Sequence, residues 1–364
     1  MGKRILRYFL RLLLLLLVTL VVLAGALYGV IYKCCNGPSE AAKATFITTI
    51  LETGQLKFLA SWVCTDEEIQ AVVDQNKMKP METESDRSLI KIARGEGPDI
   101  GTPETPEGRK IVYDENGVCI VEVAGRTFFG KMMIVRDPAQ VVVGTTYPWG
   151  EYGKDLDKIV KQTGGVGGVN GGLYQSDQNK GGKPYGVVVS HGQIQYNSPS
   201  QRGLYLIGMD ESDILVVKDI QGMKASEVEK YIKEAKIRDA VTFQEEASDV
   251  NNHFVPLVID GKGRELTGQG SGSNPRTAIG QRADGAILLF VTDGRGAGGH
   301  LGATASDLIS VMLDFGAITA ANLDGGSSST MYYKDQYEMT SVTFYYQNSS
   351  WRLPDAMIVM PPSK

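Results

Sequence analysis

Histidine and cysteine are scarce in this sequence. Its 364 residues include only 3 His and 4 Cys, with no C-x-x-C pair and no H-x-x-x-H motif. Zinc sites are usually built from such closely spaced ligands, so this composition argues against zinc. The four cysteines, which are Cys34, Cys35, Cys64 and Cys119, do not fix any disulfide pairing, and ordinary free thiols fit them equally well.

An excess of positive charge is also missing. The formal net charge is -5, which argues against a dedicated nucleic-acid binder. Glycine, in contrast, is abundant at 43 residues, about 12% against a usual ~7%. The glycines cluster in 163–172, 181–186, 294–302 and 325–326 without a periodic repeat. This pattern predicts tight turns and backbone that closely approaches a ligand.

A long apolar run stands near the N-terminus. Residues 12–32 carry no charge, and as a helix they would be about 31 Å long, the thickness of a bilayer core. We therefore predict a transmembrane helix over 12–32, preceded by a cytoplasmic tail over 1–11. The tail contains four basic residues, which are Lys3, Arg4, Arg7 and Arg11.

The position of these basic residues also predicts the orientation. They precede the span, so the N-terminus should stay in the cytoplasm and the chain from Lys33 onward should lie outside. The alternative is a cleaved signal peptide, because Ala24-Gly25-Ala26 resembles a cleavage site. The apolar run continues beyond Ala26, which favours an uncleaved anchor and a single-pass membrane protein.

The rest of the chain divides into two regions. Residues 33–108 are predicted to form a juxtamembrane segment, helical over 41–75 and a polar linker or exposed lobe over 76–108. Residues 109–364 contain many β-rich runs separated by turn residues, with few helices. This predicts an α+β (mixed α/β) domain with a mostly antiparallel or mixed central sheet and flanking helices.

Polar residues follow several of the predicted strands. Three apolar runs, "VGGVNGG", "ILLFVTDGRG" and "AANLDGGSSS", each end in an acid or amide followed by glycine. A fourth run, "SNPRTAIGQ", stands directly before the "AILLF" strand. Ligand sites gather at such strand ends. The residues placed there are Asn170, Arg276, Thr277, Asp293, Arg295, Asn322 and Asp324.

These residue types suit an anionic ligand rich in hydroxyl groups. Glycine lets backbone amides approach an anion, and the Arg276 guanidinium matches a phosphate. Asp293 and Asp324 supply the two carboxylates that sugar chemistry commonly uses. Taken alone, each Asp-Gly or Asn-Gly is an ordinary turn, so the prediction depends on their coincidence. A calcium or magnesium ion held by Asp, Asn and carbonyl oxygens is also compatible, although no metal-ligand set stands out.

The same segments resemble a known family. "NGG" at 170–172, "NPRTAIG" at 274–280, "DGR" at 293–295, "G-x-T-x-x-D-L" at 302–308 and "GAITAANLDGGSSSTM" at 316–331 are similar to the phosphodiester glycosidases. The family includes the enzyme that uncovers mannose-6-phosphate and bacterial exopolysaccharide-associated proteins. The resemblance, over about residues 110–360, implies a compact mixed α/β domain that cleaves a sugar-1-phosphodiester on the glycosidic side.

The resemblance also implies the site. The matching residues are Asn170, Arg276, Thr277, Asp293, Asn322, Asp324, Gly325 and Gly326. Two departures bear on the substrate: Leu173 stands where an aromatic residue is common, and Ser327 where glycine is common. The expected substrate is a phosphorylated glycan of the cell surface or of an exopolysaccharide.

Roles can be assigned as hypotheses. Asp324 is the first candidate for base or nucleophile and Asp293 the second. Arg276 and the amides of Gly325 to Ser327 would hold the phosphate, with Arg295 as a further substrate-binding residue. Two alternatives stay open: a divalent-metal-dependent phosphodiesterase that cuts the P–O bond, and a non-catalytic binder of anionic wall polymer.

Overall fold

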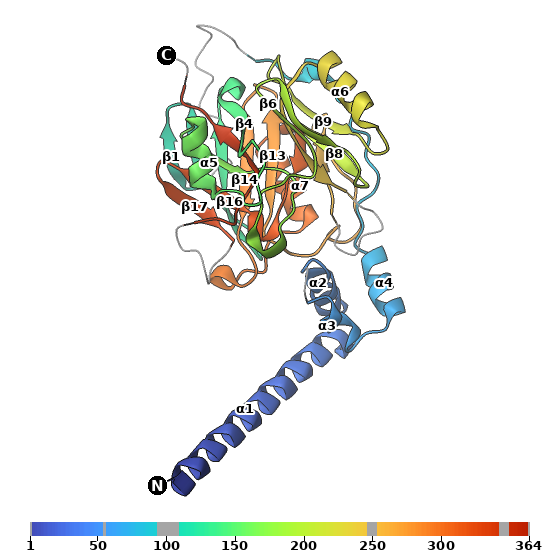
Figure 1. The fold of residues 1–364 in the computed structure, drawn as a ribbon. Coiled ribbons are helices and arrows are strands. Elements are labelled where there is room, and N and C mark those ends of the chain that lie inside the picture. The colour runs from blue at the N-terminus through green and yellow to red at the C-terminus, as the bar shows by residue number, and fades with distance from the viewer. Residues whose placement is uncertain (1, 54–55, 93–108, 246–252, 342–348, 363–364) are drawn as a thin grey trace. The chain divides into compact units, whose positions relative to one another are not determined.

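The computed structural model describes residues 2–53, 56–92, 109–245, 253–341 and 349–362. The chain forms two compact units, Met1–Gln75 and Asn76–Lys364, shown as a ribbon in Figure 1. The domain boundary predicted near residue 108 falls among residues 93–108, which lie outside the described residues.

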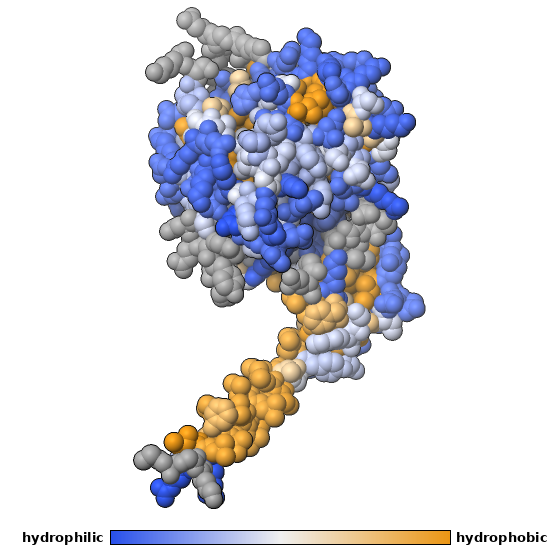
Figure 2. All heavy atoms as spheres, in the orientation of Figure 1, coloured by the Kyte–Doolittle hydropathy of each residue, from blue (hydrophilic) through white to orange (hydrophobic). Residues whose placement is uncertain are grey.

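The first unit begins with a long apolar helix, α1 (Gly2–Asn36). Within the described residues, Arg4–Asn36 is the one stretch long and apolar enough to cross a membrane. Figure 2 shows hydrophobic side chains along its surface, and Leu12, Leu15 and Val21 are each more than half exposed. A signal sequence has the same character, so the helix by itself does not separate an anchor from a cleaved leader.

Three shorter helices complete the first unit: α2 (Glu40–Leu51), α3 (Phe58–Ser61) and α4 (Asp66–Asp74). Thr65 caps α4 by accepting a hydrogen bond from the Glu68 amide, and Glu68 accepts one in return from the Thr65 amide. Ile47, Leu51 and Val72 belong to a small buried cluster of this unit. These three helices lie within or at the edge of 41–75, the range predicted to be helical.

Three antiparallel sheets build the second unit, and the predicted α+β class is confirmed. The largest described sheet has the strand order β1-β2-β3-β14-β13-β15-β11-β12. Its strands are β1 (Ile111–Glu115), β2 (Val118–Ala124), β3 (Phe129–Val135), β11 (Pro256–Ile259), β12 (Lys262–Gly263), β13 (Thr277–Arg282), β14 (Ile287–Thr292) and β15 (Ala317–Asn322).

The other two sheets are smaller. One has the order β7-β6-β10-β8-β9, with β6 (Gly186–Ser190), β7 (Gln193–Ser198), β8 (Leu204–Asp210), β9 (Leu215–Asp219) and β10 (Ile237–Gln244). The other has the order β17-β16-β5-β18-β4, with β4 (Val141–Thr145), β5 (Gly167–Asn170), β16 (Thr330–Tyr333), β17 (Gln336–Thr340) and β18 (Asp355–Val359).

One hydrophobic core lies between the three sheets. Ile279 of the large sheet, Val169 of the β5 sheet and Val241 of the β10 sheet all belong to the same buried cluster. Each sheet also carries a helix. Helix α7 (Ala305–Asp314) packs on β11 and β15, α5 (Leu156–Thr163) packs on β4, β5 and β18, and α6 (Ala225–Glu234) contacts β7. Figure 1 shows α5 and α6 on opposite sides of this unit.

Residues 76–92, predicted as part of a linker, run along the second unit. The Lys79 amide donates to the Glu265 carbonyl at 2.9 Å, and the Thr267 amide donates to the Lys77 carbonyl at 2.8 Å. Further along, the Lys91 amide donates to the Ala283 carbonyl at 2.8 Å. These backbone bonds tie the segment to the large sheet's connections, so the second unit includes it.

Candidate active site

Antiparallel pairing brings the four glycine-containing segments to one place. The start of β13 lies beside the end of β14, with Thr277 opposite Val291, and beside the end of β15, with Ala278 opposite Asn322. In the neighbouring sheet the end of β5 lies beside the start of β18, with Asn170 opposite Ala356. Because neighbouring antiparallel strands end and begin at the same edge, the loops of all these strands gather there.

Asn170 joins these loops from the inside. Its side chain is completely buried and donates from Nδ2 to the Asp324 carbonyl at 2.6 Å. Its Oδ1 accepts from the Thr277 hydroxyl at 2.7 Å and from the Thr330 amide at 3.2 Å. The two predicted substrate-binding residues Asn170 and Thr277 therefore bond to each other, and together they position the Asp324 loop.

Asp324 combines partial exposure with a raised pKa, two properties that proton transfer requires. It is partly exposed at the protein surface. Burial of the carboxyl raises its pKa from 3.8 to about 7, against the opposing effects of the Ser328 hydroxyl, the Gly325 amide and the positive charge of Arg295. A pKa near neutrality is what a general acid or base needs at physiological pH.

A second carboxyl group, Asp355, lies in the same electrostatic environment. It is the first residue of β18, it is only 1% exposed, and its Oδ1 accepts a hydrogen bond from the Gly172 amide at 2.8 Å. The pKa of Asp355 is raised to about 7, mainly by burial; the negative charge of Asp324 also raises it, whereas the Gly172 amide lowers it. The charge of Asp324 therefore acts on the Asp355 carboxyl.

Both carboxyl groups depend on the Gly171-Gly172 turn. The Asp324 amide donates to the Gly171 carbonyl at 3.3 Å, while Gly172 donates to Asp355. A side chain at Gly171 would place its Cβ 2.1 Å from Asp355 Oδ1. Glycine at this position is therefore what lets the Asp355 carboxyl sit against the turn.

Tyr174 is a buried phenol that interacts with the Asp324 loop. Its hydroxyl shares a 2.8 Å hydrogen bond with Ser328, whose hydroxyl also interacts with Asp324. Burial raises the pKa of Tyr174 well above its usual value, and the charges of Asp324 and Asp355 act in the same direction. The phenol thus stays protonated and can donate a hydrogen bond.

Arg276, predicted to bind phosphate, lies next to the Asp324 loop but its guanidinium is buried. The Arg276 Cα is 3.8 Å from where a Cβ on Gly325 would stand, so the two backbones adjoin. The guanidinium donates to the Gly272 carbonyl at 2.9 Å and to Ser271 Oγ at 3.2 Å, and it stacks on the Phe254 ring with Cζ 5.0 Å from the centroid. These contacts hold the loop before β13 in place.

Arg295 is the guanidinium that faces the Asp324 loop. It is exposed, and it donates from Nη1 to Ser327 Oγ at 2.8 Å and from Nε to Asn274 Oδ1 at 3.1 Å. A Cβ on Gly326, whose φ is +61°, would lie 2.6 Å from Arg295 Nη2. Glycine therefore both permits the turn and leaves room for the guanidinium. The positive charge of Arg295 is also the one that lowers the pKa of Asp324.

Asp293, the second predicted catalytic residue, is bonded to a histidine. Its Oδ2 lies 2.6 Å from His300 Nδ1, and its Oδ1 accepts from the Phe129 amide at 2.8 Å. Asp293 is 8% exposed, whereas the His300 side chain is 34% exposed. The pair belongs to the 293–302 loop that also carries Arg295, so an oriented imidazole stands on the same loop as the exposed guanidinium.

The remaining predicted residues connect the loops of the site to their neighbours through hydrogen bonds. Asn322 is buried and donates from Nδ2 to the Phe254 carbonyl at 3.1 Å, which ties the end of β15 to the segment before β11. The Gly326 amide donates to the Pro275 carbonyl at 2.8 Å, whereas Ser327 reaches Arg295. In the described part of the chain, no group of three or more His, Cys, Asp or Glu side chains is arranged to hold a metal ion.

Sequence reasoning missed Asp355 and Tyr174. Tyr174 follows the "NGG" run by two residues and is the aromatic residue directly after Leu173. Asp355 starts a strand, in "LPDAMIV", and has no glycine after it, so the pattern that revealed the other acids could not find it. The available signal was a Pro-Asp step at the start of a five-residue buried strand.

Comparisons with known proteins assign the family. The family model described as phosphodiester glycosidase matches residues 163–360, more than half of the sequence. The chain therefore belongs to the phosphodiester glycosidase family, and the resemblance inferred from the motifs is confirmed. Membership places it among hydrolases of the glycosidase type.

Individual relatives are more distant. The SPbeta prophage-derived uncharacterized protein YomE of Bacillus subtilis (strain 168) is 44% identical over 64 residues, which are 18% of this chain. The match spans about a tenth of the length of that relative (10%).

Two solved structures are similar to parts of the chain. The catalytic domain of zebrafish N-acetylglucosamine-1-phosphodiester alpha-N-acetylglucosaminidase, auto-inhibited by its pro-peptide, has a TM-score of 0.46 and 19% identity over 69% of this chain and 81% of that chain. A hypothetical protein from Synechocystis has a TM-score of 0.42 and 15% identity over 69% of this chain and 63% of that chain.

Proposed function

We propose that this protein is a membrane-anchored hydrolase that cleaves the glycosidic bond of a sugar-1-phosphodiester in a glycan outside the cytoplasm. The observation that carries the proposal is Asp324: its pKa is raised to about 7 beside a second buried carboxyl group, and an exposed guanidinium from another loop acts on it. Family membership supports the reaction class.

Asp324 acts as the group that exchanges a proton with the attacking water or forms the bond to the sugar. At neutral pH about half of such a group carries its charge, so both proton-accepting and proton-donating states are populated. Asp355 is a positioning residue in this proposal, because its carboxyl accepts a hydrogen bond from the Gly172 amide beside the Asp324 loop and the charge of Asp324 raises its pKa.

The departing phosphate is bound by Arg295, the Ser327 hydroxyl and the amides of the 325–327 turn. This assignment transfers the role first given to Arg276 to the guanidinium that is exposed on the Asp324 loop. A phosphate monoester leaves readily once its negative charge is neutralised, so these donors contribute most of the stabilisation of the transition state.

Asp293 orients His300 rather than attacking the sugar. A carboxylate that accepts from Nδ1 fixes the imidazole tautomer and directs Nε2 outward. His300 then stands on the loop of Arg295, where its imidazolium form, with both ring nitrogens protonated, would donate a hydrogen bond or a proton from Nε2 to a phosphate oxygen as the bond to the sugar breaks.

Location follows from α1. In this proposal α1 stays uncleaved and the basic residues on its N-terminal side stay in the cytoplasm, so that residues 33–364 would lie outside, where surface polymers are the accessible phosphorylated glycans. Exopolysaccharide or another cell-surface glycan is the substrate class we propose. Membrane fractionation with and without alkaline extraction tests the anchor, and release of the protein into the soluble fraction would contradict it.

Hydrolysis in ¹⁸O-labelled water tests the chemistry. Cleavage of the glycosidic bond puts the label on the anomeric hydroxyl of the released sugar, and mass spectrometry of both products detects it. Label in the phosphate would instead establish the alternative, a phosphodiesterase that cuts the P–O bond. Binding without release of any product would establish the third reading, a non-catalytic binder of anionic polymer.

A further inference from the structure

A pocket that belongs to neither of the two arginine loops of the candidate active site contains Arg352, which precedes Asp355 by three residues. It has a volume of about 350 Å³ and is lined by Tyr152, Gly153, Lys154, Asp155, Lys158 and Arg352. Three of these side chains are cationic and one is anionic, in a chain whose formal net charge is -5. The cations therefore outnumber the single acid in this lining.

The walls of the pocket are fixed by the backbone. Lys154 and Leu353 exchange two backbone hydrogen bonds, each 2.9 Å long, which clamp the 152–155 segment to the segment before β18. A Cβ on Gly153 would lie 2.2 Å from the Gly181 carbonyl oxygen, so only glycine allows these segments to meet. The pocket is thus preorganised and does not depend on mobile side chains alone.

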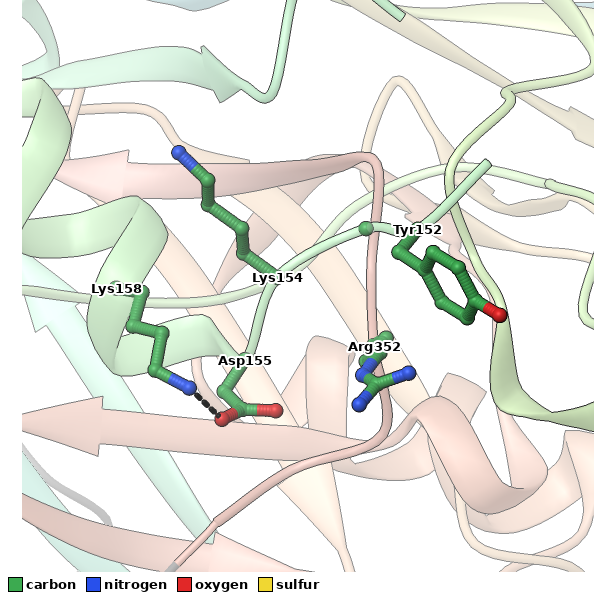
Figure 3. Close-up of a pocket in the computed structure, with 6 residues that line it drawn as sticks. Tyr152, Lys154, Asp155, Lys158 and Arg352 are labelled. Carbon is green, nitrogen blue, oxygen red and sulfur yellow. Dashed lines mark hydrogen bonds and ion pairs between the residues drawn. The ribbon is translucent and has the colours of Figure 1, made fainter. Parts of the chain in front are cut away.

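Its side chains combine a cation with an aromatic face. Arg352 Cζ lies 5.1 Å from the centroid of the Tyr152 ring, and Tyr152 is 54% exposed. Figure 3 shows Arg352 between Tyr152 and Asp155, with Lys158 reaching Asp155 from α5 at 2.5 Å and Lys154 pointing away. An arginine held against an aromatic ring presents its planar fork at a defined angle, which suits a phosphate.

The chain itself connects this pocket to the catalytic group. Arg352 precedes Asp355 by three residues, so their Cα atoms are separated by at most about 11 Å even if the chain is fully extended. The pocket residue Arg352 is therefore on the chain segment that leads directly into Asp355, whose pKa the charge of Asp324 affects.

A neighbouring pocket extends the same surface. It has a volume of about 460 Å³ and includes Trp149, Lys180 and Lys183 in its lining. Its wall also includes Gln175, which directly follows Tyr174, the phenol that bonds to Ser328 in the active-site loop. The lining also contains the acids Glu151 and Asp177, and Lys180 is ion-paired with Glu151 at 2.8 Å.

We propose that the pocket of Tyr152, Lys158 and Arg352 is a subsite for a second phosphate of the polymer substrate, beyond the phosphate at the bond that is cleaved. Arg352 and Lys158 bind the phosphate oxygens, and the exposed face of Tyr152 packs against the adjoining unit of the chain. This inference rests on the proposed function, because it takes the substrate to be a glycan with repeated phosphates.

Binding of an uncleavable probe tests the subsite separately from catalysis. A poly(glycerol phosphate) oligomer carries repeated phosphodiesters but no glycosidic bond, and maltohexaose serves as the uncharged comparison. Isothermal titration calorimetry of the full-length protein in detergent should detect the phosphate oligomer and not maltohexaose. The affinity should fall with added salt, as expected for phosphate contacts with cationic side chains.

Substitutions of single residues test whether the phosphate oligomer binds in this pocket. Arg352→Ala should weaken the oligomer affinity about tenfold or more, since a hydrogen bond between charged groups is lost. Lys158→Ala provides a second test if the first variant does not fold, and it should also weaken binding. Lys230→Ala is the matched control: it removes one cation from an exposed side chain on α6, on the opposite side of the second unit, and should bind as the wild type does.

Several results would overturn the subsite. They are undetectable binding by the wild type, equal affinity for maltohexaose, unchanged affinity in both pocket variants, and equal weakening by Lys230→Ala. The two proposals fail in different ways. A protein that binds the oligomer through Arg352 but hydrolyses no sugar-1-phosphodiester would retain the subsite and refute the glycosidase assignment, whereas degradation of the oligomer itself would establish a phosphodiesterase.

Discussion

Replacing Asp324 by Asn should remove activity and, at the same time, stabilise the fold at neutral and alkaline pH. Asn has nearly the shape of Asp but cannot exchange a proton, so loss of a general base should lower turnover about a hundredfold or more. The stability effect has a different origin, which is the cost of keeping the carboxylate charged in a largely desolvated position.

The size and sign of the stability effect follow from the pKa. A carboxyl group with a pKa of 3.8 unfolded and about 7 folded binds more protons in the folded state, so the fold loses stability as the pH rises from about 4 to about 7. At about 1.4 kcal/mol per pKa unit the full effect is about 4 kcal/mol above pH 7. Because Asp324 is partly exposed and coupled to Asp355, we expect about 2 kcal/mol.

Two measurements on the same variant check this reasoning. Hydrolysis is followed over a panel of sugar-1-phosphodiesters, and urea unfolding is compared with that of the wild type at pH 4 and pH 8. The variant should be more stable at pH 8, and the difference should shrink towards pH 4. Asp314→Asn is the matched control, because Asp314 is 57% exposed and the same change there should alter stability by less than about 0.5 kcal/mol.

Either half of the prediction can fail. Near-normal turnover by the Asn variant would remove Asp324 from the catalytic role. If the variant is no more stable than the wild type at pH 8, burial does not favour the protonated form of the Asp324 carboxyl. Asp324 would then have no raised pKa with which to transfer a proton at neutral pH.

Three further predictions concern the surroundings of Asp324. Arg295→Ala removes a positive charge that lowers the pKa of Asp324, so the acidic limb of the pH profile of kcat/KM should move to higher pH, whereas an unmoved limb would show that Arg295 does not affect the Asp324 carboxyl. Asn170→Ala removes three buried hydrogen bonds and should lower the free energy of unfolding by about 3 kcal/mol in urea titrations; a loss below 1 kcal/mol would contradict its role in joining the loops. Turnover should persist in EDTA, because Arg295 and backbone amides neutralise the phosphate in our proposal, and activity that is lost on chelation and restored by calcium or magnesium would favour the metal-dependent phosphodiesterase.

The sequence motifs contain most of the candidate site residues, but they do not contain Asp355, which interacts with them. The segments around Asn170, Thr277, Asp293 and Asp324 were recognisable because each combines a strand-like apolar run with a polar residue and glycine. Their convergence follows from antiparallel pairing, in which the beginning of one strand lies beside the end of the next. Asp355 was not recognisable, because a single acid before an apolar strand resembles any surface turn.

The two arginines show a different limit. Both "NPR" and "DGR" place a guanidinium at a strand end, and the sequence contains nothing that distinguishes a buried arginine from an exposed one. The tertiary structure separates them. Phe254 and the carbonyl of Gly272 surround Arg276, whereas Arg295 leaves a left-handed turn at φ +55° and faces Ser327.

The sequence by itself determined the features that depend on local pattern. These are the apolar N-terminal helix, the many short strands, the four glycine-containing loops and, through them, the family. Such features need only hydrophobic periodicity and the conformational freedom of glycine, both of which are readable over a few residues.

Only the tertiary structure decided which groups share an environment. The effect of Asp324 on Asp355 and the contact between Tyr152 and Arg352 join residues from different strands or loops, whereas Asp293 and His300 lie on one loop. Burial and the distance between charges set a pKa, and both arise from the packing of segments that are far apart along the chain.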